Sequence, residues 1–202
     1  MSLIDRVKNI IVTPKTEWEV IALKEEPAAS VITGYVLPLA AIGAICAFVG
    51  YAFIGLNVVG IRMTGFNWGL YYAVMMFISA ILGVLISAFF VDMLAPSFGS
   101  EKNMNKSVQL VAYSYTPSLI GAFLTIIPAL SMIGGLFGIY GIYLWYLGLG
   151  PLKKTPEDKK VVYLIVSFIL IFIVSMVIGA ILGMILFSAM GIGAVSTGRF
   201  GM

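Results

Sequence analysis

Long apolar runs with almost no charge limit this chain to very few kinds of fold. Five stretches approach or exceed the roughly 20 apolar residues that cross a bilayer core, and they cover 29–55, 70–94, 108–128, 131–149 and 161–189. Hydrophobic residues make up 61% of the 202 residues and charged residues only 10%, too little charge to cover such a surface in water. Because the runs lack the alternation of barrel strands, the sequence predicts an all-α polytopic membrane protein, a bundle of five transmembrane helices.

The basic residues predict the number of spans and their direction. Ten of the 12 lie in the N-terminal segment, in the loop after 70–94 and in the loop after 131–149. Five spans place all ten on one face, which the positive-inside rule makes cytoplasmic. If 108–149 crossed only once, the two lysine-bearing loops would lie on opposite sides. We therefore predict a cytoplasmic N-terminus and a C-terminus outside.

The first 28 residues predict one or two short amphipathic helices. Apolar residues from Leu3 to Ile11 follow helical spacing, Thr13-Pro14 interrupts them, and Thr16 with Glu19 has the capping-box pattern of a second helix start. The segment can lie in the headgroup layer, or its apolar stripe can pack on the cytoplasmic ends of the bundle. In either case it is the candidate docking site for a protein partner, through Leu3, Ile4, Val7, Ile10, Ile11 and Trp18.

The stretch AYSYTPSLIG, residues 112–121, places five hydroxyl side chains and a proline inside the third apolar run. Pro117 lacks an N–H and leaves the carbonyl of Tyr113 without its helical partner, while nearby hydroxyls can satisfy that carbonyl. Pro38 acts likewise on Gly34 in the first span. These two kinks can be the discontinuous helices of a transporter or ordinary proline kinks.

One acidic residue, Asp92, falls inside a predicted span, near its cytoplasmic end. Spans two and three form an antiparallel pair, which brings Asp92 to the depth of Gln109 and Tyr113, and Thr116 shares their helix face. We predict a polar cluster of these four residues, with Lys106 as a further candidate. The cluster can bind a proton or solute, or it can anchor the hairpin at the membrane surface.

The composition provides few of the side chains that enzymes use for catalysis. The chain has no histidine and one cysteine, Cys46, so the usual zinc, copper and haem ligands and the Ser-His and Cys-His pairs are missing. It contains no glycine-rich phosphate loop. A net charge of +3 is too small to indicate nucleic acid as a partner. We expect no catalytic residues, no metal site and no cofactor.

The chain divides into three predicted parts. A cytoplasmic or interfacial segment covers 1–28, the transmembrane domain covers 29–189, and a glycine-rich flexible tail covers 190–202. Small residues four apart, such as Gly134 and Gly138, allow close helix packing within the chain and allow a homo-oligomer.

Three segments resemble the Yip family, the Ypt/Rab-interacting membrane proteins, in its short prokaryotic branch. They are TPKTEWEVI at 13–21, AYSYTPSLIG at 112–121 and IYGIYLWYLGLGPLKKTPEDKK at 139–160. The resemblance implies five spans, a cytoplasmic N-terminus and a prokaryotic cytoplasmic membrane. Eukaryotic members act in vesicle traffic and membrane shaping and bind Rab-type GTPases and one another. This chain lacks their long cytosolic N-terminal region and their Asp-Leu-Tyr-Gly-Pro motif, so the fold and a general scaffold role are what the resemblance implies here.

Two functions follow from these expectations. The first is a non-enzymatic scaffold or adaptor that organises other membrane components through its bundle and its N-terminal segment. The alternative is a small transporter or channel that uses the kinked spans and the polar cluster around Asp92 and Tyr113. A cavity open to water that reaches Pro117 favours transport, whereas a filled bundle with an exposed apolar groove favours the scaffold.

Overall fold

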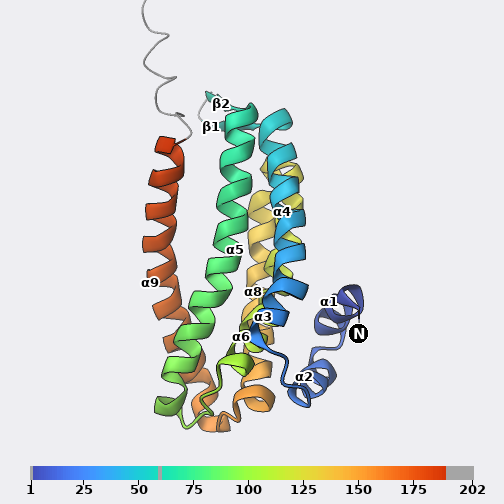
Figure 1. Cartoon of the computed structure of the whole chain (residues 1–202), viewed down its shortest axis with the longest axis vertical. Coiled ribbons are helices and arrows are strands. Elements are labelled where there is room, and N and C mark those ends of the chain that lie inside the picture. The colour runs from blue at the N-terminus through green and yellow to red at the C-terminus, as the bar shows by residue number, and fades with distance from the viewer. Residues whose placement is uncertain (1, 59–60, 190–202) are drawn as a thin grey trace, which may run out of the picture.

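The computed structural model describes residues 2–58 and 61–189, and it is a bundle of helices with two short helices packed beside one end (Figure 1). Four helical stretches are long and apolar enough to cross a membrane: Ala28–Ile54, Phe66–Phe98, Pro128–Lys153 and Glu157–Ala189. The chain is thus all-α in character and multi-pass, as the apolar runs predict. The predicted tail, 190–202, lies outside the described residues.

The elements follow one another along the bundle. The N-terminal pair is α1 (Leu3–Val12) and α2 (Pro14–Ala22). The first long stretch consists of α3 (Ala28–Val31), the π-helical η1 (Ile32–Val36), α4 (Leu37–Val49) and η2 (Gly50–Ile54). Strands β1 (Leu56–Val58) and β2 (Ile61–Met63), which the sequence did not predict, pair antiparallel with Leu56 opposite Met63. After them come α5 (Phe66–Leu94), η3 (Ala95–Phe98), α6 (Met104–Ser114), α7 (Thr116–Gly121), η4 (Ala122–Ile126), η5 (Pro128–Leu130), α8 (Ser131–Lys153) and α9 (Glu157–Ala189).

The third predicted span differs from the other four. In place of one helix over 108–128, the structure has the shorter pieces α6, α7 and η4. They run back along the bundle, with α6 against α5 and α8, and with α7 and η4 against α4 and α8. The break falls at Tyr115, directly before Thr116 and Pro117, because the proline cannot donate to the carbonyl one turn earlier. The apolar helix in this region, Thr116–Ile126, is shorter than the four long stretches.

Capping and a proline at the first helical position explain where the two N-terminal helices begin. Ser2 caps α1: its hydroxyl accepts from the backbone N–H of Asp5, whose carboxylate accepts from the N–H of Ser2 in return. The second helix begins at Pro14, two residues before the predicted capping box at Thr16. Proline suits the first helical position because its missing N–H would have no helical partner there.

The helix of the fourth predicted span, α8, extends beyond its predicted end. The sequence ended this span at 149 and assigned Lys153 to a solvated loop, but α8 continues through Pro151 to Lys153. We name the end of the bundle that carries the α5–α6 and α8–α9 connections the basic end (Figure 1). The additional turn of α8 places Lys153 inside the protein at this end.

Glycines let the backbones of α7 and α8 approach each other. A Cβ atom added at Gly134 would lie 2.4 Å from the carbonyl oxygen of Gly121, and the reverse distance is also 2.4 Å. No side chain fits at that distance, so this contact requires glycine on both sides. The neighbouring Gly135 is different, because nothing lies within 4 Å of an added Cβ.

This difference gives a matched test of the fold. We expect Gly134→Ala to lower the free energy of unfolding by about 1–3 kcal/mol, because the added methyl group forces two backbones apart. Gly135→Ala should leave stability unchanged or raise it slightly. Thermal unfolding in detergent, followed by circular dichroism, measures both, and equal melting temperatures would contradict the close contact.

Candidate functional site

A buried ion pair lies at the basic end of the bundle. Asp92, on the last turn of α5, and Lys153, on the last turn of α8, are 4% and 0% exposed, and their Oδ1 and Nζ atoms are 3.1 Å apart. Ser107 on α6 donates to the same Asp92 oxygen at 3.0 Å and accepts from Lys153 at 2.7 Å. Lys153 also donates to the backbone carbonyl of Asn103 at 3.3 Å. Three helices therefore meet at one charge-assisted network.

Gln109 and Tyr113, which we predicted beside Asp92, lie in a different network. Gln109 Nε2 donates to the carbonyl of Lys24 at 3.0 Å, and the Tyr113 hydroxyl donates to Glu26 at 2.8 Å. Lys106 also donates to the carbonyl of Lys24, at 3.0 Å. The helix α6 thus presents Ser107 to Asp92 and its other polar side chains to the segment between α2 and α3.

That segment, residues 22–28, is held by the start of α6. The side-chain amides of Asn103 and Asn105 donate to Glu25 at 3.0 and 3.2 Å, and Asn105 accepts from the backbone N–H of Ala28 at 3.0 Å. These hydrogen bonds lower the pKa of Glu25, because they favour its ionised form. The 22–28 segment is therefore an ordered connection that fixes where α1 and α2 lie.

Arg6 connects the N-terminal pair to the bundle. Its guanidinium forms an ion pair with Glu17 of α2, lies 3.7 Å from Glu26 and stacks 5.3 Å from the centre of the Tyr113 ring. Arg6 and Glu17 are both buried. We call Arg6, Glu17, Glu26 and Tyr113 the N-terminal latch. These contacts were not predicted from the sequence, because Glu26 and Tyr113 are distant from Arg6 along the chain.

Thr116 and Tyr35 supply hydroxyl groups that form hydrogen bonds at the helix break. Thr116 Oγ1 donates to the carbonyl of Tyr113 at 2.7 Å, which is the carbonyl that Pro117 leaves without a helical partner. Thr116 and the hydroxyl of Tyr35 lie 2.6 Å apart. Pro38 stands at the start of α4, directly after the π-helical turn η1. These contacts repair the backbone and join α7 to the first long stretch.

The predicted docking residues differ in exposure. Trp18 and Ile10 are fully buried, and Leu3, Val7 and Ile11 pack partly buried against the core. Ile4 is 75% exposed. Tyr140 of α8 adds a hydrogen bond of 2.7 Å to the carbonyl of Ile11. Most of the apolar stripe thus faces the bundle, and partner docking through these residues stays a prediction.

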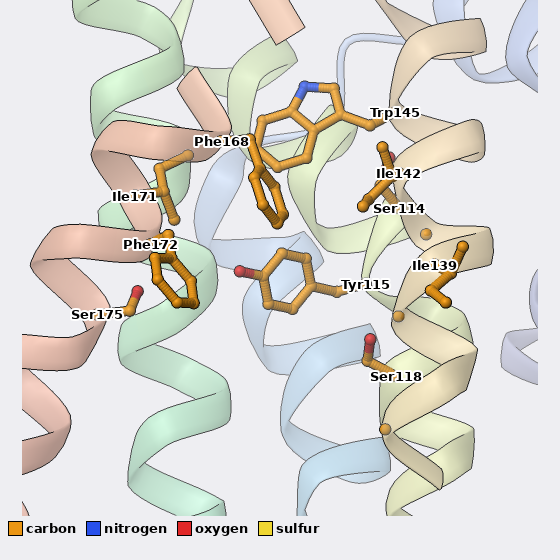
Figure 2. Close-up of a pocket in the computed structure, with 13 residues that line it drawn as sticks. Ser114, Tyr115, Ser118, Ile139, Ile142, Trp145, Phe168, Ile171, Phe172 and Ser175 are labelled. Atoms are coloured by element: carbon orange, nitrogen blue, oxygen red, sulfur yellow. The ribbon is translucent and has the colours of Figure 1, made fainter. Parts of the chain in front are cut away.

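Two cavities lie next to these networks. A polar one of about 240 Å³ is lined by the latch residues Arg6, Glu26 and Tyr113, together with Lys24 and Tyr35. An apolar one of about 410 Å³ lies between α8 and α9, with Tyr115 among its lining residues (Figure 2). Pro117 lines neither of them.

The ion pair predicts the effect of removing one charge. Lys153→Met leaves a buried carboxylate without its cation, and we expect a loss of about 3–5 kcal/mol in the free energy of unfolding. Lys154→Met is the matched control, because the adjacent Lys154 side chain is 71% exposed. Thermal unfolding in detergent measures both. If adding Asp92→Asn to Lys153→Met restored none of the loss, the pair would not be its cause.

The latch predicts a local effect. Arg6→Met removes the charge that holds Glu17 and Glu26, so we expect faster amide hydrogen exchange across α1 and α2 with unchanged exchange in α5. Exposed Lys8 on the same helix supplies the control Lys8→Met. Hydrogen exchange read by mass spectrometry distinguishes them. Equal exchange in α1 of both variants would show that Arg6 does not hold the segment.

Comparison with known proteins agrees with this architecture. Inner membrane protein YohC of Escherichia coli strain K12, and the same protein of strain O6:H1, are each 27% identical to this chain over 151 residues, which is 72% of this chain and 77% of theirs. No solved structure matches the chain. The family model described as the Yip1 domain matches residues 8–179. A match over this length shows that the chain is a multi-pass membrane protein of the Yip1 domain family.

Proposed function

We propose that this protein is a non-enzymatic membrane scaffold or adaptor whose N-terminal helix pair presents a docking surface at the basic end of the bundle. The observation that carries this proposal is the internal use of the polar groups. Asp92, Gln109, Tyr113 and Thr116 each have a hydrogen-bond partner within the chain. Groups committed in this way support a rigid platform, whereas catalysis or transport needs groups that are free to meet a substrate.

The outward surface of the N-terminal helix pair carries three strongly exposed apolar side chains. While the inner face of α1 and α2 packs on the bundle, Ile4, Val12 and Leu23 are 75%, 67% and 87% exposed. Exposed apolar side chains near ordered polar ones are typical of interaction sites. We propose that these three residues, rather than the buried part of the stripe, contact the partner.

The proposed placement in the membrane follows the basic residues. We propose that α6, α7 and η4 together make a fifth crossing, so that the basic end faces the cytoplasm and the C-terminus lies outside. The three predicted parts, 1–28, 29–189 and 190–202, then correspond to a cytoplasmic segment, the membrane domain and an external tail. The relatives in Escherichia coli are named as inner membrane proteins, which supports a bacterial inner membrane as the location.

Transport remains the alternative function. The polar cavity, which Arg6 and Tyr35 line, is the observation that favours it, because a small solute can fit there. Two facts weigh against it. The cavity contains opposite charges that already neutralise each other, and the larger cavity near the helix break is apolar.

Partner capture tests the scaffold. We would purify the full chain from its own host in nanodiscs beside the variant Ile4→Ser/Val12→Ser/Leu23→Ser and quantify co-purifying proteins by mass spectrometry. Loss of apolar contacts worth about 1.4 kcal/mol reduces capture about tenfold. We therefore expect at least one partner to be reduced by this factor in the triple variant.

The control variant changes residues in the same two helices but removes no apolar side chain. Lys8→Ser/Lys15→Ser changes exposed residues of α1 and α2 and should retain the partner. Equal capture by all three proteins would contradict docking at this surface. Solute flux into proteoliposomes that disappears in Tyr113→Phe would support transport instead.

A further inference from the structure

Three glycines of α8 line the apolar cavity between α8 and α9. Gly135, Gly138 and Gly141 lie along the α8 wall, and Phe168 and Phe172 of α9 lie across from them. In Figure 2, Tyr115 lies between the two helices, Trp145 stands at one end, and Ser118 and Ser175 lie on opposite walls. The volume of about 410 Å³ is within the range of small-molecule sites.

The position along α8 places the cavity inside the bilayer. Trp145 precedes Lys153 by eight residues, so its Cα lies about 12 Å along the helix from the basic end. Gly135 lies ten residues earlier in α8, about 15 Å farther from the basic end. The Trp145 end is therefore nearer to the basic end of the bundle, and the Gly135 end is nearer to the opposite end of the span, which begins at Pro128.

The mouth of the cavity is continuous with the lipid-facing surface. Ile139 on α8 is 65% exposed and Phe172 on α9 is 57% exposed, while Ile171 and Trp145 in the interior are each 5% exposed. Along this face both helices carry apolar side chains that contact lipid in a membrane. Lipid hydrocarbon chains therefore lie at the opening. An acyl chain can enter the apolar cavity without a desolvation cost, because it makes no hydrogen bonds to water.

Two buried polar atoms belong to residues that line the cavity. Trp145 Nε1 and Ser114 Oγ are buried and have no hydrogen-bond partner among the described residues, although both residues line the cavity. Figure 2 shows the indole nitrogen at the end of the Trp145 ring that is directed away from Tyr115. A buried N–H of this kind normally has an acceptor. A phospholipid supplies one, because an ester carbonyl stands at the root of each acyl chain.

We propose that this cavity is a binding site for one acyl chain of a membrane phospholipid. The chain enters between Ile139 and Phe172 and lies along the glycine wall of α8 toward Gly135. Its ester carbonyl accepts from Trp145 at the end of the cavity nearer to the basic end. This inference does not depend on the scaffold role, since it concerns the lipid-facing side of the bundle and not the N-terminal pair.

Fluorescence quenching tests the site in a bilayer. The full chain and its Trp145→Phe variant would be reconstituted in phosphatidylethanolamine vesicles whose acyl chains carry bromine at mid-chain, and in unbrominated vesicles. The difference between the two proteins isolates the emission of Trp145. We expect bromine to quench most of this emission, although the residue is almost fully buried, because the chain passes beside it.

Filling the cavity should exclude the chain. Gly135→Leu places a side chain where nothing lies within 4 Å of the added Cβ, and we expect it to restore most of the Trp145 emission. Gly179→Leu is the matched control, since its added Cβ also has nothing within 4 Å and it does not line this cavity. Ile139→Phe narrows the mouth at an exposed position and replaces Gly135→Leu if that variant does not fold.

The outcomes separate clearly. No quenching in the parent chain, or equal quenching in the parent and in the cavity-filling variants, would overturn the site. Loss of quenching in Gly179→Leu as well would also overturn it, because the effect would not come from the cavity. Ether-linked brominated lipid lacks the carbonyl, so weaker quenching is expected with it, and equal quenching would overturn the contact with Trp145.

Discussion

A charge buried at the edge of the hydrocarbon needs an opposite charge beside it, and this requirement organises the basic end of the protein. Lys153 is fully buried and is held by Asp92 and Ser107. Because each of the three residues belongs to a different helix, α5, α6 and α8 must end or begin at one point. Breaking such a pair leaves an uncompensated charge, so the arrangement allows few alternatives. The packing of α5, α6 and α8 along the rest of the bundle depends on the relative positions that this network fixes.

The need of buried charges for oppositely charged partners also explains why the N-terminal segment packs on the bundle. Arg6 and Glu17 are buried together, and the start of α6 binds the 22–28 connection through its amide side chains. The segment is therefore part of the folded bundle, with one face inward and the other outward. A partner that binds the outward face meets an ordered surface and does not need to fold the segment first.

The lipid-facing side has a different character. Glycines on α8 are used in two ways: Gly134 permits direct backbone contact with α7, and Gly135 leaves space. The first use makes the bundle tight, and the second leaves a hollow that the chain does not fill. In water such a hollow would be an interior defect, whereas beside hydrocarbon it is a place where a lipid chain can lie.

The sequence by itself determined the class of fold, the family and the positions of the long apolar segments. Apolar runs of this length have few solutions in lipid, and their signal is local, so 28–54, 66–98, 128–153 and 157–189 agree closely with four of the five predicted spans. The break before Pro117 was also foreseeable, because a proline removes a particular backbone hydrogen bond.

Only the tertiary structure decided which polar groups meet. Asp92 pairs with Lys153, 61 residues away, and Tyr113 pairs with Glu26, 87 residues away. Helix-face periodicity places Gln109 and Tyr113 on one side of α6, but it does not say which neighbour that side faces. The predicted end of α8 was wrong for a related reason. Two adjacent lysines, Lys153 and Lys154, are typical of a solvated loop, and only the position of Asp92 in the fold explains why Lys153 is buried. Contacts between distant segments depend on how helices pack, and that information is not local in the chain.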